Sequence, residues 1–351
     1  MISGVAGFIG SNLLQDLLAL GQHVVGLDNF STGHRVNLDD ALASPLRGSA
    51  TFNMIEGDIR DLDVCRRACR SADYVLHHAA LGSVPWSMDD PLRTNAVNVD
   101  GFVNMLVAAK DAGVRRFVYA SSSAVYGDTP AYPQIEQTLG RPLSPYAASK
   151  SANETYALAF QMSYGLQTIG LRYFNVFGRR QDPAGAYAAV IPRWIAALLR
   201  GERCRIFGDG ETTRDFCYVA NVIQANLLAA TSGSEATGES YNIACAESVT
   251  LNQLFGMMRD GLARKDSHFA TAVPQYDGFR PGDIRFSCAS IEKARSKLCY
   301  SPSHGVREGL EEALDWYVDK AISWNTAAPS RRSAHPSIPS VHQPSVVQAA
   351  L

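Results

Sequence analysis

Strand-like and helix-like segments alternate through the first half of the chain, and this alternation limits its fold more than any other feature. The apolar runs lie at 24–27, 74–76, 117–119 and 167–174, and the helix-length segments include 95–112 and 145–164. The order strand, helix, strand, helix predicts a parallel sheet that is covered by helices on both faces. We therefore expect an α/β fold with a doubly wound parallel sheet.

Beyond Asn175 the alternation gives way to turn-rich segments and helical patterns, which predict a smaller second lobe at the C-terminal end of the sheet. The expected division gives residues 1–174 to the first domain, 218–243 returning to it, and 175–217 with 244–322 to the substrate-binding lobe. Residues 323–351 are rich in Ser, Pro, Ala and His, so we expect a disordered tail with too few apolar anchors to fold.

A glycine pattern at the start of the chain predicts a nucleotide-binding turn. Gly4, Gly7 and Gly10 follow the order G-x-x-G-x-x-G, which lets the backbone approach a pyrophosphate at the start of a helix. Asp28 follows eighteen residues later, where a carboxylate can hold both ribose hydroxyls and repel a 2′-phosphate. The pattern favours a Rossmann-type domain that binds NAD; a glycine turn with a capping aspartate is the alternative. Because only residues 1–3 precede Gly4, we expect either a short first strand or an omitted native start.

A tyrosine and a lysine four residues apart predict a catalytic pair. Tyr146 and Lys150 share one face of a predicted helix. A nearby ammonium favours the phenolate, which can act as the base for an alcohol that loses a hydride. The serines at 121–123 end a predicted strand, where a hydroxyl can relay the proton. A surface pair and a polar loop are the plain alternatives.

Taken together, these motifs resemble those of the extended short-chain dehydrogenase/reductases, in the NAD-dependent sugar-nucleotide epimerase/dehydratase family. The resemblance extends from residue 2 to about 319, and its matching stretches are 4–11, 26–34, 57–60, 80–85 and 171–183. Within this family the chain most resembles bacterial UDP-N-acetylglucosamine 4-epimerases of surface-polysaccharide pathways.

The resemblance implies a role for each matching residue. Those expected to hold NAD are Gly4, Gly7, Phe8, Ile9, Gly10, Asp28, Asn29, Ser31, Gly33, Asp58, Ile59, Ala79, Ala80, Asn98, Tyr146, Lys150 and Phe174, the last against the nicotinamide. Those expected to act in catalysis are Ser122, Tyr146 and Lys150, with Ser123 as the second choice of serine. Those expected to bind the UDP-sugar are Ser83, Ser122, Tyr146, Asn175, Ala189, Val190, Arg214, Arg280, Asp283 and Ser287.

Two positions point to a subclass. Dehydratases of the family place an acid pair after the catalytic hydroxyl, whereas Ser123 and Ala124 follow Ser122 here. Ser287 matches a gatekeeper that is small where an N-acetyl group must fit. Trp86 departs from the basic or small residue that is common in relatives. We expect a UDP-N-acetylglucosamine 4-epimerase that works through a 4-keto intermediate. A UDP-glucose or UDP-uronic-acid epimerase, a UDP-sugar decarboxylase and an inactive nucleotide-sugar-binding protein are the alternatives.

Composition argues against other classes of protein. With 32 Lys and Arg against 34 Asp and Glu, no basic excess favours nucleic acid. No apolar run approaches the ~18 residues of a membrane span, and seven scattered cysteines suggest reduced thiols and no metal site. We expect a cytoplasmic enzyme without nucleic-acid or membrane partners. The resemblance also implies a homodimer in which helices 95–112 and 145–164 form a four-helix bundle. Their apolar residues include Val97, Leu106, Val107, Ala157 and Leu158, which could instead face the sheet.

Overall fold

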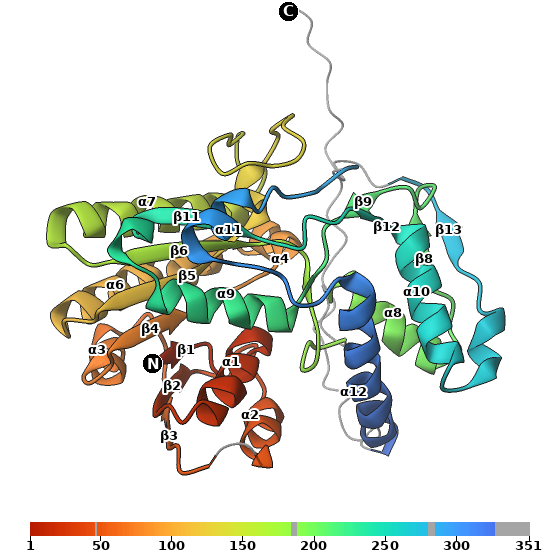
Figure 1. Cartoon of the computed structure of the whole chain (residues 1–351), viewed down its shortest axis with the longest axis horizontal. Helices are drawn as coiled ribbons and strands as arrows, with labels where there is room; N and C mark the ends of the chain where they lie inside the picture. The colour runs from red at the N-terminus through yellow and green to blue at the C-terminus, as the bar shows by residue number, and fades with distance from the viewer. Residues whose placement is uncertain (46–47, 184–187, 280–284, 327–351) are drawn as a thin grey trace, which may run out of the picture.

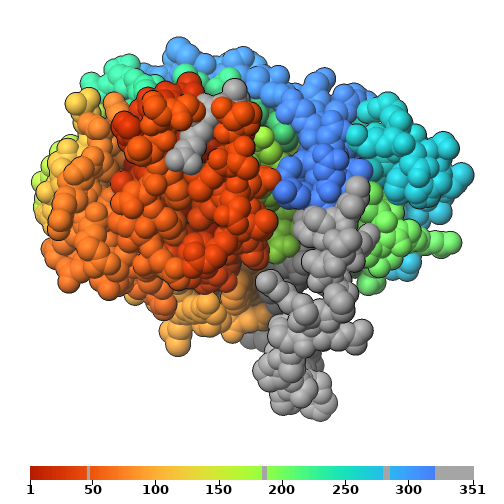
Figure 2. All heavy atoms as spheres, turned by 90° about the horizontal axis from the view of Figure 1, so that it is seen from below, coloured from red at the N-terminus to blue at the C-terminus, as the bar shows by residue number. Residues whose placement is uncertain are grey.

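Two lobes of unequal size lie side by side in this computed structural model (Figure 1). The structure describes residues 1–45, 48–183, 188–279 and 285–326, with side chains up to residue 320. The larger lobe holds the N-terminal half together with some later segments, and the smaller lobe consists of segments from the C-terminal half (Figure 2). Most of the expected tail lies outside the described residues, but the last helix, α12 (Val306–Thr326), runs four residues past the expected boundary at 322.

Seven parallel strands form the central sheet of the larger lobe, in the order β11-β6-β5-β4-β1-β2-β3. The strands are β1 (Ile2–Ser3), β2 (Val24–Asp28), β3 (Phe52–Glu56), β4 (Tyr74–His77), β5 (Arg116–Ser122), β6 (Thr168–Tyr173) and β11 (Glu239–Ile243). β1 has only two residues, yet it pairs with β2 on one side and β4 on the other. The expected doubly wound α/β fold is confirmed.

Helices cover both faces of the sheet (Figure 1). One face carries α3 (Leu62–Cys69), α6 (Gly101–Asp111) and α7 (Pro145–Tyr164); the other carries α1 (Phe8–Ala19), α2 (Arg35–Leu42), α9 (Val219–Thr231) and α11 (Glu292–Leu298). Each face has its own buried apolar core, and Val118 and Phe117, neighbours on β5, point to opposite ones. α4 (Val84–Asp89) and α5 (Pro91–Asn95) pack beside α7.

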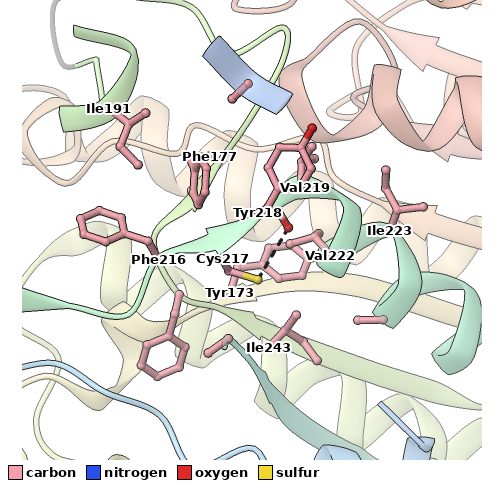
Figure 3. Packing of buried hydrophobic residues seen from close by; sticks show 14 of the residues in the cluster. Tyr173, Phe177, Ile191, Phe216, Cys217, Tyr218, Val219, Val222, Ile223 and Ile243 are labelled. Carbon is pink, nitrogen blue, oxygen red and sulfur yellow. Dashed lines mark hydrogen bonds between the residues drawn. The ribbon is translucent and has the colours of Figure 1, made fainter. Parts of the chain in front are cut away.

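The smaller lobe is built from short strand pairs and helices. Its elements are β7 (Val176–Phe177) with β10 (Cys217–Tyr218), β8 (Arg205–Phe207) with β13 (Gln275–Asp277), β9 (Thr213–Arg214) with β12 (Val249–Thr250), and the helices α8 (Val190–Leu199), α10 (Leu251–Ala263) and α12. The chain returns to the sheet between these pieces, through α9 and β11. Buried aromatic rings join the lobes: Phe177, Phe216 and Tyr218 belong to one buried cluster, and Figure 3 shows Phe177 and Tyr218 on the side of α9.

Partly buried ion pairs also join the lobes. The Arg180 guanidinium, only 4% exposed, donates to Asp40 Oδ2 at 2.8 Å and to the Ser11 carbonyl at 3.2 Å. Lys320 of α12 donates to Asp40 Oδ1 at 3.0 Å. Because Ser11 lies on α1 and Asp40 on α2, these contacts hold the smaller lobe against the glycine-rich end of the sheet.

Candidate active site

A cavity of about 1310 Å³ lies at the C-terminal ends of the sheet strands. The connections from β1 and β4 leave in opposite directions, and ligands of doubly wound sheets bind at such a crevice. The cavity brings together most of the residues expected from the sequence. They are Gly4, Gly7, Phe8, Ile9, Gly10, Asp28, Asn29, Ser31, Gly33, Asp58, Ile59, Ala79, Ala80, Ser122, Ser123, Tyr146, Lys150, Asn175, Ala189, Arg214 and Ser287.

The glycine turn packs too tightly to accept side chains. Gly4 has a φ of +70°, and a Cβ at this position would lie 2.7 Å from the Ala79 nitrogen. A Cβ on Gly10 would lie 2.1 Å from the Gly4 carbonyl oxygen. The turn therefore draws the first residues of α1 against β1, and Phe8 and Ile9 line the cavity where the helix begins. Such a backbone cradle fits the diphosphate of NAD.

Acidic side chains follow β2 and β3 at this end of the cavity. Asp28 Oδ2 accepts from the Ala6 N–H at 2.9 Å, and Oδ1 accepts from the Phe30 N–H at 2.8 Å. Burial raises the pKa of Asp28, although these N–H groups oppose the shift. Asp58 accepts from the Asn29 amide at 2.8 Å, and its hydrogen bond with Arg60 lowers its pKa to about 2. The Asp28 carboxylate is thus oriented as a ribose-binding group requires.

The serine loop and α7 place hydroxyl groups at the middle of the cavity. Ser122 ends β5, and its Oγ accepts from the Ala124 N–H at 3.1 Å, which leaves the hydroxyl hydrogen available to donate. Tyr146 stands in the first turn of α7, where its own N–H donates to Ser87 Oγ at 3.1 Å. Ser121 instead donates to Glu154 at 2.5 Å, so it serves the packing of β5 against α7.

The charges at Tyr146 and Lys150 differ from the sequence-based expectation. Burial raises the pKa of Tyr146, and its hydrogen bond with Ser122 opposes this rise. Lys150 Nζ donates to the Ala120 carbonyl at 2.9 Å and lies 5.9 Å from the centre of the Tyr146 ring. Burial lowers the pKa of Lys150 to about 8, against the attraction of Glu154. The pKa of Tyr146 therefore lies above its ordinary value, and burial is the main cause.

Asn98 was expected to touch the cofactor, but it lies behind the cavity wall. Its Oδ1 accepts from the Leu81 N–H at 2.8 Å, and its Nδ2 donates to Ser149 Oγ at 3.1 Å. Ser149 in turn donates to the Tyr146 carbonyl at 2.8 Å. Asn98 thus connects the segment after β4 to the first turn of α7, which carries Tyr146.

The structure does not place the other expected residues among those that line this cavity. Phe174 is fully buried in the core, and Tyr173 lines the cavity in its place, since neighbouring side chains of an extended strand alternate in direction. Ser83 caps α4, because its Oγ accepts a hydrogen bond from the Trp86 N–H at 3.2 Å. Neither Ser83 nor Trp86 lines the cavity. Val190 lines an adjoining cavity of about 260 Å³. Arg280 and Asp283 lie outside the described residues.

Several residues that line the cavity carried no signal in the sequence. They are His78, Tyr132, Gln134, Arg285 and Phe286. His78 donates through Nε2 to Asn226, and burial lowers the pKa of His78 to about 4, so its ring is neutral. Tyr132 and Gln134 come from the loop before α7, which has no regular period that could have marked them. Among the described residues, no cluster of His, Cys, Asp or Glu could hold a metal ion, and no helix is long and apolar enough to cross a membrane.

The fold and the site define a dinucleotide-dependent enzyme that acts at the C-terminal edge of a doubly wound sheet. Residues 1–244 match the NAD dependent epimerase/dehydratase family, and the chain belongs to that family.

Three comparisons describe its relatives. A UDP-glucose 4-epimerase of Mycolicibacterium smegmatis is 36% identical over 92% of this chain and 99% of that protein. A UDP-glucuronate 4-epimerase of Thermodesulfobacterium geofontis is 30% identical over 90% of this chain and 95% of its own length. The solved structure of a UDP-N-acetylglucosamine 4-epimerase from Methanobrevibacter ruminantium, in complex with UDP-N-acetylmuramic acid, is 38% identical, with a TM-score of 0.83 over 91% of this chain and 97% of that one. The expected class, an NAD-dependent sugar-nucleotide epimerase, is confirmed.

Proposed function

We propose that this protein interconverts UDP-N-acetylglucosamine and UDP-N-acetylgalactosamine by epimerisation at C4. The observation that carries the proposal is the small, half-buried side chain of Ser287, which lines the same cavity as Ser122 and Tyr146. A hydroxymethyl group at this position leaves room for the acetamido group at C2 of the sugar.

The polar groups of the cavity favour epimerisation over elimination of water. Among the described residues, the carboxylates that line it are Asp28 and Asp58, both at the β2–β3 end, remote from the serine loop in the strand order. Elimination needs an acid near the hydroxyl that leaves, and Ser123 and Ala124 cannot supply one. Without such a group, the reaction is limited to moving a proton and a hydride.

The residues around C4 divide this work. Tyr146 takes the proton of the 4-hydroxyl group, and Ser122 hydrogen-bonds to both the 4-hydroxyl oxygen and the phenol oxygen of Tyr146. NAD, which the glycine turn and Asp28 would hold, would supply the hydride chemistry when bound. Lys150, held by the Ala120 carbonyl, keeps a positive charge near the phenol as it ionises. The 4-keto sugar turns over in the cavity before it is reduced on its other face, so the site must hold two orientations of the ring.

The nucleotide half fits the adjoining cavity on the smaller lobe. Asn175, Ala189 and Arg214 line both cavities, so the two cavities lie next to each other. A guanidinium at the junction suits a diphosphate, because its planar donors match phosphate oxygens. The distal cavity, bounded by Val190 and Phe207, then receives the uracil.

Incubation of the purified protein with UDP-N-acetylglucosamine, followed by chromatography of the products, tests the proposal directly. UDP-N-acetylgalactosamine is the expected product. Conversion of UDP-glucose or UDP-glucuronate with no turnover of the N-acetyl sugar would assign the protein to the activity named for one of its other relatives. Absence of turnover on all three would contradict the enzyme assignment.

Substituting Ser287→Tyr is expected to lower kcat/KM for UDP-N-acetylglucosamine by about 10–100-fold and to spare UDP-glucose. A phenol there would fill the space for the acetamido group, and overpacking commonly costs ~1–3 kcal/mol. Kinetics of both substrates with wild type and variant provide the measurement. Equal losses on the two substrates would make Ser287 a structural residue and remove the main support for an N-acetyl preference.

We also propose that the protein is a homodimer that pairs through α7. Leu106 and Ala157 are buried in the sheet core, and Val97 and Val107 are partly buried against it, so these residues offer little surface to a second copy. The outward face of α7 is a different stripe, at helical spacing: Thr155, Leu158, Ala159 and Met162 are all exposed, Leu158 by 48% and Met162 by 78%. An exposed apolar stripe of this kind suits a helix-to-helix contact with a second copy.

Light scattering at micromolar concentration is expected to show a dimer for the wild type and a monomer for the double variant Leu158→Asp, Met162→Asp. Two carboxylates on each α7 would then have to be buried in the interface. Val36→Asp is the matched control, because Val36 is 60% exposed on the distant α2, and it should remain dimeric. A monomeric wild type would refute the dimer.

A further inference from the structure

Gln134 ties the loop before α7 to the segment that carries Ser287. Its N–H donates to the Cys288 carbonyl at 2.8 Å, and its carbonyl accepts from the Ser290 N–H at 2.9 Å. The two segments run parallel here, with Gln134 paired to Ala289. Gln134 is 7% exposed and lines the cavity, so its side chain stands next to the proposed position of the acetamido group.

The orientation of the Gln134 amide is settled by its partner. The Cys288 N–H donates to Oε1 at 3.0 Å, and only the oxygen of an amide can accept that bond. The NH₂ group therefore lies on the opposite side. Within the part of the chain that the structure describes, no group accepts a hydrogen bond from Nε2. Protein atoms do not fully enclose Nε2 either. It follows that this donor opens onto the cavity.

A buried network holds this donor relative to the catalytic serines. Asn242 Nδ2 donates to the carbonyls of Gln134 at 3.1 Å and Ser290 at 3.0 Å. Asn242 Oδ1 accepts from the Tyr126 hydroxyl at 2.6 Å, and Tyr126 closes the short helix that begins at Ser123. The Gln134 backbone is thus fixed between the Ser287 segment and the loop that carries Ser122, and the Cys288 N–H holds the side-chain amide.

We propose that the Gln134 NH₂ group donates a hydrogen bond to the carbonyl oxygen of the C2 acetamido group, which makes Gln134 a specificity residue. This proposal rests on the proposed function. An amide NH₂ offers donors alone, and an acetamide carbonyl offers an acceptor alone, so the two match. Ser287 provides room for the acetamido group, whereas Gln134 gives it a positive interaction. Sites that hydrogen-bond a substrate group discriminate more strongly than sites that only leave space for it.

The variant Gln134→Glu tests the Nε2 donor of the amide separately from its Oε1 acceptor. A glutamate oxygen can still accept from the Cys288 N–H, but the donor toward the cavity becomes an acceptor that repels the acetamide carbonyl. We expect kcat/KM for UDP-N-acetylglucosamine to fall by about 10–100-fold, mainly through KM, and UDP-glucose to change by less than about threefold. Gln134→Met removes both the Oε1 acceptor and the Nε2 donor. It should show the same loss of kcat/KM for UDP-N-acetylglucosamine, together with a lower melting temperature.

Gln161→Met is the matched control. Gln161 accepts from the Thr168 N–H at 3.0 Å and donates to Thr237 at 3.0 Å, and it does not line the cavity. Its loss should lower the melting temperature and leave the ratio of the two kcat/KM values unchanged. If wild type converts UDP-N-acetylglucosamine and Gln134→Glu keeps that ratio, the inference fails and the proposed function stands. A wild type that converts UDP-glucose alone overturns both.

Discussion

Replacing Tyr146 with phenylalanine is expected to lower kcat for UDP-N-acetylglucosamine by about 10²–10⁴-fold, which is the usual contribution of a general base. The phenylalanine ring keeps the packing of the first turn of α7, so folding and bound NAD should stay at wild-type levels. The measurements are kcat by chromatography of the products, NAD content after denaturation, and the melting temperature. A near-normal kcat with normal NAD content would assign the base to another residue.

The serines supply the internal comparison. Ser122 has its Oγ held by the Ala124 N–H at 3.1 Å and is the hydroxyl that affects the Tyr146 phenol. Ser122→Ala should therefore reduce kcat less than Tyr146→Phe and more than Ser123→Ala. If Ser123→Ala has the larger effect of the two, Ser123 is the residue that bridges the substrate and Tyr146.

Local patterns in the sequence predicted the parts of the site that depend on local geometry. The glycine spacing at residues 4–10 requires a close approach of α1 to β1, and Asp28 follows directly from the end of β2. Tyr146 and Lys150 needed only helical periodicity to share a face. Both sets of residues line the cavity where the fold brings the strand ends together.

Side-chain direction and long-range contacts were not accessible in the same way. The resemblance assigned Phe174 to the cavity, but one step along the extended chain exchanges it with Tyr173. Asn98 hydrogen-bonds to both Leu81 and Ser149, and the bond to Ser149 depends on how α7 packs. The orientation of the Gln134 amide depends on Cys288, 154 residues later in the chain, and no local sequence pattern predicts such a pair.

A buried ion pair lies beside the loop that carries Ser122 and Ser123. Arg172 of β6 donates to both carboxylate oxygens of Glu154 on α7, at 2.9 and 2.8 Å, and the two side chains are 5% and 13% exposed. The same guanidinium donates to the Tyr126 hydroxyl at 3.1 Å, and Glu154 accepts from Ser121. The pair therefore joins α7, β6 and the serine loop behind the reacting groups.

Glu154→Leu is expected to lower the free energy of unfolding by about 3–5 kcal/mol, because it leaves the Arg172 guanidinium buried without its carboxylate. The double variant Glu154→Leu, Arg172→Met should recover much of this loss, because two apolar side chains of similar size leave no charge buried without a partner. Urea unfolding of the single and double variants provides the measurement. The exposed pair Arg264–Glu311, with side chains 54% and 50% exposed, is the control, and Glu311→Leu should cost less than about 1 kcal/mol. If the double variant is less stable than Glu154→Leu, the charge of Arg172 is satisfied by Tyr126 and the Glu136 carbonyl, and the position of the serine loop does not depend on Glu154.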